Sequence, residues 1–351
     1  MPGTLIPIRP RRAPPPNLFD QLANRVVGQP HAMTQIVPYV QMYRAGLAAE
    51  GRPVGVFLLL GPTGTGKTKT VEALAEALHG SEKAMLKVDC GEFQMEHEIA
   101  KLIGAPPGYL GHRETQPMLT QQKLSGVTSE GSNLSLVLFD EIEKAAPSMT
   151  RLLLGVLDKA TLRLGDNTSV NFERTMIFLT SNLGAAAMRK ELCPDFGFES
   201  MVHAATNAAT RGGLAKLASI GMGEVRRKFS PEFVNRIDAV ITYQPLSADS
   251  LEIIFNQQIA ALEKHIHVRL EERAFEIELS EGARGLLLKL GTSAEFGARE
   301  LKRTILRKLT QPLAALLESG GIPPESCVRA ELAADGENLD LRVLELIVEE
   351  G

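Results

Sequence analysis

The segment GPTGTGKT, residues 61–68, places three glycines, a lysine and a threonine directly after an apolar run. Glycines let backbone N–H groups turn toward an anion, and the start of the following helix adds positive potential. The spacing positions Lys67 to reach the β and γ phosphates of a nucleotide and Thr68 to bind magnesium. The residues assigned to phosphate binding are Gly61, Pro62, Thr63, Gly64, Thr65, Gly66, Lys67 and Thr68. The segment therefore predicts a nucleoside triphosphate site.

Two acids follow a second apolar run, in the segment LSLVLFDEIEKA, residues 134–145. Acids after a buried strand are common and are not specific by themselves. With the phosphate loop upstream, Asp140 is expected to hold magnesium through its water shell, and Glu141 to act as general base on the attacking water. A protein that only bound nucleotide would not need Glu141, so the sequence favours hydrolysis.

Short apolar runs alternate with helical patterns from about residue 54 onward. The runs are nearly continuous in apolar residues, which is typical of parallel strands buried on both faces. They are VGVFLLL, AMLKVD, LSLVLFD, RTMIFLTSN and AVITYQP. Between the first two, helical spacing ends at Gly80, and the next helical pattern, Met95 to Ile103, ends before Gly104. This alternation predicts a doubly wound parallel α/β sheet.

The pattern changes after Pro245. Apolar residues around Leu251 and Leu301 mark amphipathic helices, while CVRAEL and LDLRVLELIV indicate late strands. We expect a large α/β domain over residues 17–245 and a smaller, mainly helical domain over 246–351. Residues 1–16 are rich in proline and arginine, which suits an extended tail or linker, with a basic recognition arm as the alternative.

Composition narrows the function classes. The 351 residues are 44% hydrophobic and 23% charged, and the net charge of -4 argues against a strongly nucleic-acid-binding surface. Cys90, Cys193 and Cys327 lie far apart, which predicts reduced thiols and a cytoplasmic setting. The longest apolar run is too short to span a bilayer, and the N-terminus lacks the apolar core of a signal peptide. We therefore expect no membrane association.

Seven segments, in order, resemble the AAA+ ATPases, specifically the C-terminal ATPase module of the Clp class of ring-forming unfoldases and disaggregases. The resemblance covers about residues 22 to 350. The segments are RVVGQ, GPTGTGKT, LIGAPPGYLG, LVLFDEIEKA, LTSNLG, FSPEFVNRID and FGARELKR. It implies a P-loop AAA+ fold in which the smaller domain is a lid, with ATP and Mg²⁺ as cofactors.

The resemblance also assigns roles that spacing alone does not. Asn182 is similar to the polar sensor near the γ phosphate, and Arg236 to the arginine finger that reaches into the neighbouring subunit's site. Arg299 resembles the second sensor, through which the lid detects nucleotide. Without the resemblance, both arginines would be ordinary surface residues.

The adenine pocket and the assembly follow from the same resemblance. Val26, Val27 and Gly28 would line the adenine pocket, with Ile254 from the lid. A finger supplied by another subunit implies a head-to-tail contact, which closes into a ring. The family implies a homo-hexamer.

The segment GAPPGYLGHRE, residues 104–114, surrounds one tyrosine with prolines and glycines, so neither a helix nor a central strand can run through it. In Clp proteins the matching loop projects an aromatic residue into the ring's channel, where it grips threaded polypeptide. The resemblance therefore implies that Tyr109, followed by Leu110, grips substrate. The alternative is a tyrosine packed on the core.

A peptidase partner is the last expectation. Protease-coupled relatives carry an aliphatic or aromatic residue, a glycine, and an aromatic residue or leucine in a loop that inserts into ClpP-like peptidases. Phe196, Gly197 and Phe198 match this pattern, although the first position is more often Ile, Leu or Val. The alternative is that both rings pack onto the domain.

Taken together, the sequence predicts an ATP-driven motor that threads and unfolds polypeptide. Two alternatives remain at this stage. One is a module of the same family that acts on nucleic acid as a loader or helicase, and the other is a nucleotide-dependent scaffold without useful turnover. Net acidity and Tyr109 speak against the first, and Glu141, Asn182 and Arg236 against the second.

Overall fold

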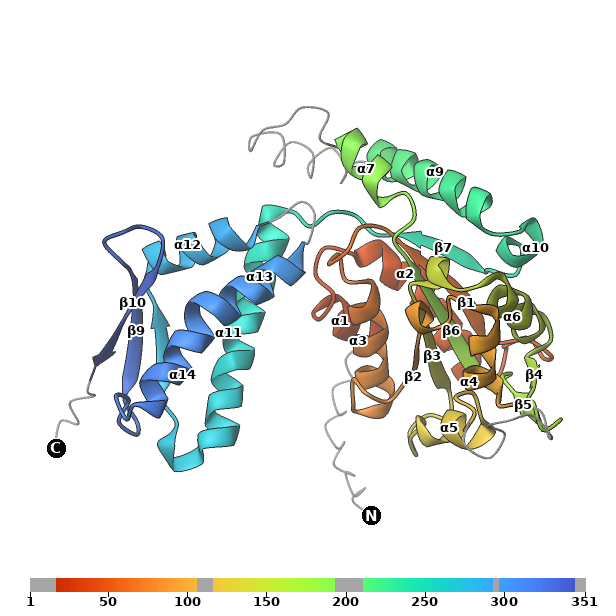
Figure 1. The fold of residues 1–351 in the computed structure, drawn as a ribbon, viewed down its shortest axis with the longest axis horizontal. Coiled ribbons are helices and arrows are strands. Elements are labelled where there is room, and N and C mark those ends of the chain that lie inside the picture. The colour runs from red at the N-terminus through yellow and green to blue at the C-terminus, as the bar shows by residue number, and fades with distance from the viewer. Residues whose placement is uncertain (1–16, 106–115, 193–210, 293–296, 345–351) are drawn as a thin grey trace, which may run out of the picture.

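The computed structural model describes residues 17–105, 116–192, 211–292 and 297–344 (Figure 1). Three predicted features lie outside these ranges: the tail over 1–16, the pair Tyr109 and Leu110, and the tripeptide Phe196 to Phe198.

A five-stranded sheet forms the centre of the larger part of the chain, with strand order β2-β3-β6-β1-β7. Every neighbouring pair of strands is parallel. The strands are β1 (Gly55–Leu60), β2 (Leu86–Asp89), β3 (Ser135–Asp140), β6 (Thr175–Ser181) and β7 (Ala239–Thr242). Each corresponds to one predicted apolar run, so the parallel α/β sheet is confirmed.

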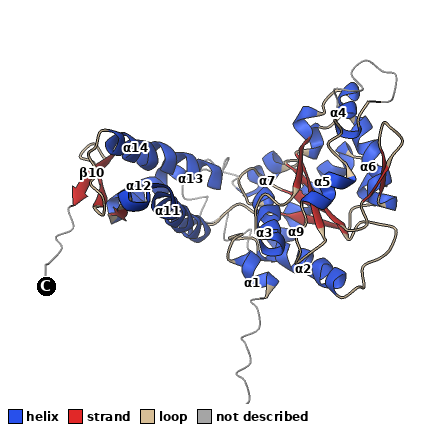
Figure 2. Ribbon diagram, turned by 90° about the horizontal axis from the view of Figure 1, so that it is seen from below, coloured by secondary structure: helices blue, strands red, loops and turns tan. Residues whose placement is uncertain are grey.

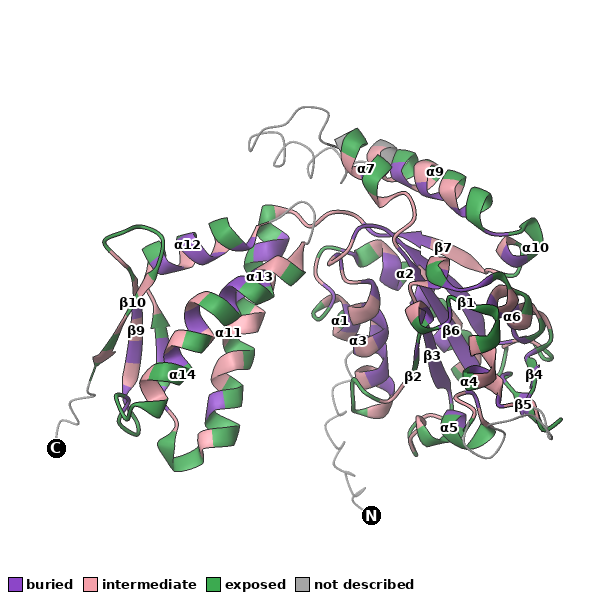
Figure 3. Ribbon diagram, in the orientation of Figure 1, coloured by how far each residue is buried: buried purple, intermediate pink, exposed green. Residues whose placement is uncertain are grey.

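Helices cover both faces of this sheet. Along β1, Val56, Leu58 and Leu60 face one hydrophobic core, and Phe57 and Leu59 face the other. The central strands β1, β3 and β6 are buried almost throughout, as Figure 3 shows, because helices cover both of their faces, whereas the edge strands β2 and β7 are only partly buried. One core is closed by α1 (Leu18–Ala23), α2 (Pro30–Arg44) and α3 (Lys67–His79). The other is closed by α4 (Ile99–Ile103), α5 (Gln121–Gly126), α6 (Pro147–Lys159), α7 (Ala185–Leu192), α9 (Arg211–Lys228) and α10 (Pro231–Val234).

One helix ends where the sequence predicts, and another begins later than the sequence predicts. Helix α3 ends before Gly80, whose φ of 77° is the left-handed conformation that glycine adopts readily. The pattern that began at Met95 does not form one helix. Met95 is 61% exposed, and its N–H donates to Glu98 Oε2 at 2.8 Å, which caps a 3₁₀ turn over Glu96–Glu98. The α-helix proper, α4, begins only at Ile99.

The residues after Pro245 build a third hydrophobic core. Their helices are α11 (Ala248–Leu270), α12 (Glu281–Gly291), α13 (Ala298–Ile305) and α14 (Gln311–Glu318), and a π-helical turn over Leu306–Thr310 joins the last two. A three-stranded sheet in the order β10-β9-β8 lies against them. Its strands are β8 (Glu276–Leu279), β9 (Cys327–Leu332) and β10 (Leu339–Leu344). The mainly helical character was predicted, whereas β8 was not.

Two further features complete the arrangement. A short antiparallel pair, β4 (Thr161–Arg163) and β5 (Ser169–Asn171), follows α6. Figure 2 shows α11 to α14 grouped apart from the helices around the central sheet. Within the described ranges, no helix combines the length and apolar character needed to cross a bilayer.

Candidate nucleotide-binding site

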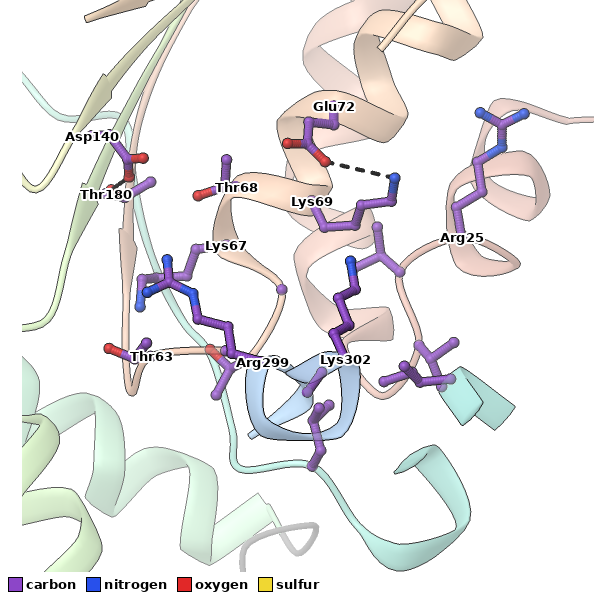
Figure 4. Close-up of a pocket in the computed structure, with 18 of the residues that line it drawn as sticks. Arg25, Thr63, Lys67, Thr68, Lys69, Glu72, Asp140, Thr180, Arg299 and Lys302 are labelled. Carbon is purple, nitrogen blue, oxygen red and sulfur yellow. Dashed lines mark hydrogen bonds and ion pairs between the residues drawn. The ribbon is translucent and has the colours of Figure 1, made fainter. Parts of the chain in front are cut away.

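A cavity of about 360 Å³ lies where the phosphate loop, the segment after α1, the carboxyl ends of β3 and β6, and helices α11 and α13 meet. Such a position, outside the carboxyl ends of parallel strands, is where open α/β sheets bind ligands. Figure 4 shows that charged side chains enter the cavity from both the central sheet and the lid.

The phosphate loop needs glycine for steric reasons as well as for backbone freedom. A Cβ on Gly61 would lie 2.6 Å from the carbonyl oxygen of Tyr243, because the loop passes close to the end of β7. Gly64 and Gly66 have φ values of 76° and 103°. Thr65 Oγ1 donates to the carbonyl of Pro62 at 2.9 Å, which closes the turn. The loop therefore holds one shape just ahead of α3.

The side chain of Lys67 lies inside the curve of the phosphate loop. Its Nζ donates to the carbonyls of Gly61 at 2.6 Å and Pro62 at 2.8 Å and to Asn182 Oδ1 at 2.8 Å. Burial lowers the pKa of Lys67 to about 8, although the nearby carboxylate of Glu143 acts in the opposite direction. Gly61 and Pro62 thus act through their carbonyls and are not part of the cavity wall.

Thr68 and Asp140 are the donors that fit magnesium. Both line the cavity, Thr68 from the first turn of α3 and Asp140 from the end of β3. Among the described residues no three His, Cys, Asp or Glu side chains gather in a metal-binding group. Mg²⁺ does not require one, because it commonly binds one or two protein oxygens together with waters and substrate phosphates. A hydroxyl and one carboxylate match that chemistry.

Thr180, which the sequence analysis did not single out, fixes both acids. Its Oγ1 donates to Asp140 Oδ1 at 2.5 Å and accepts the N–H of Glu141 at 3.0 Å. Burial alone raises the pKa of Asp140, but hydrogen bonds from Lys87 and Thr180 outweigh it, so the pKa lies below its ordinary value. The Lys87 ammonium pairs with Asp140 Oδ2 at 2.8 Å. Asp140 is therefore ionised at neutral pH, as a magnesium ligand must be.

Glu141 occupies a strained backbone position at the end of β3. Its φ and ψ of 57° and 50° are left-handed, which costs a side chain other than glycine about 1 kcal/mol. The conformation directs Glu141 into the cavity wall. Its Oε2 forms an ion pair with Lys144, and its Oε1 accepts from Asn182 Nδ2 at 3.4 Å.

Asn182 joins the lysine of the phosphate loop to the carboxylate expected to act as the base. Its backbone N–H donates to Glu143 Oε1 at 3.0 Å, which fixes the residue at the end of β6. Glu143 was missed by sequence reasoning, and the only signal for it was its place two residues after Glu141. Its Oε2 is buried and has no hydrogen-bond partner in the part of the chain that the structure describes.

The lid closes the phosphate end of the cavity. The N–H of Ala298 donates to the carbonyl of Gly64 at 3.2 Å, which places the start of α13 on the phosphate loop. Gly297 has φ of 50°, and a Cβ there would lie 2.9 Å from the same carbonyl oxygen. Arg299 follows in the first turn of α13, and Figure 4 shows its guanidinium extending toward Lys67.

Apolar side chains line the opposite end. Val26 and Val27 come from the segment after α1, and Leu246 and Ile254 from the start of the lid. Gly28 is not part of the cavity wall; its φ is 79°, and a Cβ there would lie 2.8 Å from Ser250 Oγ. An apolar slot beside a phosphate cradle is suited to a nucleobase.

Gln29 connects three segments around the cavity and was not predicted. Its side chain is fully buried, and its Nε2 donates to the carbonyls of Thr65 at 3.2 Å and Gln244 at 2.8 Å. Its Oε1 accepts the N–H of Gln244 at 3.2 Å. One side chain therefore holds the segment after α1, the phosphate loop and the connection from β7 to the lid.

Arg236 lies outside this cavity. Its guanidinium pairs with Asp158 at 2.9 Å on the surface, with 48% of its side chain exposed. Among the predicted site residues that the structure describes, Arg236, Gly28, Gly61 and Pro62 do not line the cavity, and the others do. A role for Arg236 in a neighbouring subunit stays a prediction.

The family description "AAA domain (Cdc48 subfamily)" matches residues 52–240, more than half of the chain. The chain belongs to this family of AAA ATPases. A second description, the C-terminal D2-small domain of ClpB protein, matches residues 246–330. The resemblance to the Clp class is confirmed, and the AAA fold places the phosphate loop, the two acids and Asn182 at the sheet edge where the cavity lies.

Relatives of this AAA chain include ClpB of Meiothermus ruber, 37% identical over 308 residues that make up 87% of this chain and 33% of that protein. The ClpC ATP-binding subunit of Staphylococcus saprophyticus is also 37% identical, over 87% of this chain and 35% of its own length. The chain thus spans about a third of the length of these relatives.

Solved structures of Hsp104 share the fold. The extended Hsp104:casein complex of Saccharomyces cerevisiae has a TM-score of 0.77 and 27% identity, over 93% of this chain and 52% of that one. A closed state of Hsp104 with ATPγS and FITC casein has a TM-score of 0.74 and 28% identity, over 93% and 51%.

Proposed function

We propose that this chain is an ATP-driven motor that unfolds or remodels polypeptides. The observation that carries the proposal is the connected set Lys67, Asn182 and Glu141, which ties a phosphate-binding lysine to a carboxylate at one wall of the cavity. The nucleotide site would take ATP with Mg²⁺, for which Thr68 and Asp140 supply the protein oxygens.

The hydrolysis step follows from these positions. Glu141 accepts a proton from the attacking water, the water oxygen bonds to the γ phosphorus, and the bond to the bridging oxygen breaks, which releases ADP and phosphate. Lys67 and Arg299 offset the charge that develops on the phosphate oxygens. Mg²⁺, when bound, neutralises charge on the same phosphates. Asn182 forms hydrogen bonds with Glu141 and Lys67 and so fixes the spacing between them.

Closure of the lid would convert hydrolysis into motion. The contact of Ala298 with Gly64 joins α13 directly to the phosphate loop, so a change in the loop moves the lid. Polypeptide as the substrate is supported by the relatives named chaperone ClpB and by the Hsp104 structures solved with casein. We place the motor in the cytoplasm, since Cys90 and Cys327 are free thiols.

The experiment that tests the proposal compares wild type with Tyr109→Ala on a fluorescent protein that carries an unfolded tag. Wild type should destroy the fluorescence only with ATP. The variant should keep its ATPase activity and lose unfolding, because Tyr109 would grip substrate apart from the phosphate chemistry. Unfolding by the variant at the wild-type rate contradicts the proposal that Tyr109 grips the substrate. ATPase activity stimulated by DNA but not by polypeptide contradicts the proposed substrate class.

A homo-hexameric ring is part of the proposal, with Arg236 acting on the neighbouring subunit's nucleotide. Arg236→Ala should bind nucleotide and fail to hydrolyse it. Rings mixed from Arg236→Ala and Glu141→Gln subunits contain some sites with both residues intact, so part of the ATPase activity should return. No recovery in mixed rings whose co-assembly is demonstrated contradicts a finger supplied by the neighbour.

Coupling to a ClpP-like peptidase through Phe196, Gly197 and Phe198 is the final element. Exposed apolar anchors can supply most of the energy of such an interface. Degradation of a tagged substrate by the motor with its host's peptidase should be lost in Phe198→Ala while ATPase activity is kept. Absence of any complex with the peptidase, with ATP or ADP, contradicts this coupling.

A further inference from the structure

Three cationic side chains stand around the part of the cavity that lies away from Asp140, namely Arg25, Lys69 and Lys302, while Arg299 stands toward the phosphate end. Two of them are already paired. Arg25 forms an ion pair with Glu76, and Lys69 forms one with Glu82 and a second with Glu72 at 3.6 Å. Their charges are therefore largely compensated within the protein.

Lys302 differs from these neighbours. Its side chain makes no ion pair or hydrogen bond with any residue in the described ranges, although its own helix carries Glu300. Glu300 is engaged by Arg303 at 3.8 Å and by Arg307 at 2.6 Å, which leaves it unavailable to Lys302. An uncompensated ammonium at the wall of a concave site is a ready partner for an anion.

The side chains of Lys302 and Arg299 point to different parts of the cavity. The two residues are three positions apart on α13, so they share one face of the helix. Figure 4 shows Arg299 extending toward Lys67, whereas Lys302 extends toward Lys69, the third residue of α3. Arg299 thus faces the end of the cavity where the γ phosphate is expected, and Lys302 faces the middle, between the phosphate loop and the apolar base slot.

We propose that Lys302 is a nucleotide-binding residue supplied by the lid, whose ammonium contacts the α-phosphate and ribose, the part that ADP and ATP share. This inference rests on the proposed nucleotide site and adds a second contact from the lid to it. A lysine suits the position because it places a compact charge at the end of a flexible stem, without the fixed fork of an arginine.

The position of Lys302 determines which kinetic constant it controls. A contact with the shared part of the nucleotide is equally strong before and during hydrolysis, so its loss raises KM and leaves kcat nearly unchanged. Arg299 faces the γ phosphate, so its loss should lower kcat and discriminate ATP from ADP. The lid would therefore hold any nucleotide through Lys302 and sense ATP through Arg299.

The test measures the affinity of the full chain for fluorescent ADP and for a slowly hydrolysed ATP analogue. Lys302→Ala should weaken both by the same factor, about tenfold. Lys302→Arg keeps the charge and should restore most of the affinity. The control Lys289→Ala removes another exposed lysine of the lid, on α12, and should bind like wild type. The loss in Lys302→Ala should shrink in high salt, since an exposed charge is screened.

The possible results separate the inference from the function on which it rests. Failure of the wild type to bind either nucleotide contradicts the nucleotide site itself. Wild-type binding with equal affinity in Lys302→Ala overturns only the role of Lys302. A loss confined to the ATP analogue also overturns it, because that result would place the ammonium at the γ phosphate beside Arg299.

Discussion

Asn182 Oδ1 accepts a hydrogen bond of 2.8 Å from Lys67 Nζ, and it does so from the end of β6, the strand paired with the one that leads into the phosphate loop. The same amide turns its nitrogen toward Glu141 Oε1 at 3.4 Å. One side chain thus sets the spacing between the group expected to bind the terminal phosphates and the group expected to activate water. The structure makes Asn182 a positioning residue, in addition to the sensor role that the resemblance predicts for it.

Replacing Asn182 with alanine should lower kcat about a hundredfold, by analogy with the loss of one oriented polar group at a reaction centre. Nucleotide affinity should change much less, because the phosphate loop and the base slot remain. Steady-state ATPase activity and binding of fluorescent ADP measure the two effects. A variant with wild-type kcat would show that Glu141 and Lys67 hold their places without Asn182.

Gln29→Ala should destabilise the protein by about 3 kcal/mol, since it leaves the buried polar groups of Thr65 and Gln244 without partners. It should also weaken nucleotide binding, because the phosphate loop loses its link to the connection between β7 and the lid. Urea denaturation measures the free energy of unfolding. Gln94→Ala is the matched control: that glutamine is exposed, and among the described residues its side chain bonds only to Gly91, so about 0.5 kcal/mol is expected. Equal losses in the two variants contradict the special role of Gln29.

Nucleotide binding should depend on pH through Lys67. Its pKa in the folded protein is lowered to about 8, and a bound phosphate favours the charged form. Binding of ADP at pH 8.5 should therefore take up a proton, and the affinity should fall as the pH rises through 8. Calorimetry in buffers of different ionisation enthalpy measures the uptake, and Lys67→Gln should show none. Binding at pH 8.5 without proton uptake contradicts this shift.

The same pKa has a consequence for stability, with a definite sign. The unfolded chain keeps the lysine proton up to its ordinary range near 10.5, whereas the folded protein releases it near 8. The unfolded state thus binds more protons between these values, so the contribution of Lys67 to the free energy of unfolding rises with pH across the window. Below pH 8 the buried charge is a cost that bound nucleotide relieves.

Local sequence patterns predicted the elements whose signals are continuous along the chain. The five apolar runs became β1, β2, β3, β6 and β7, and the phosphate loop and its helix followed from glycine spacing and the stop at Gly80. These features depend on burial on both faces and on glycine conformations, which neighbouring residues specify.

Residues whose contacts lie far away in the sequence gave no such local signal. Gln29 bonds to Gln244, 215 positions away, and Thr180 holds Asp140 from a neighbouring strand. Glu143 and Lys302 resemble ordinary charged surface residues until the sheet and the lid place them at the cavity. Met95 fits a helical spacing, but its N–H donates to Glu98 and caps a 3₁₀ turn ahead of the α-helix. Position in three dimensions, rather than residue type, gives these side chains their roles.

Glu141→Gln gives the most direct test of the central claim, that this cavity binds ATP and hydrolyses it with Glu141 as the base. The substitution keeps the size of the side chain and removes the carboxylate, so the phosphate loop and the base slot are unchanged. The account predicts ATP binding close to wild type and a kcat at least about a hundredfold lower, the usual contribution of a general base. Binding of ATP followed by hydrolysis at the wild-type rate would contradict it.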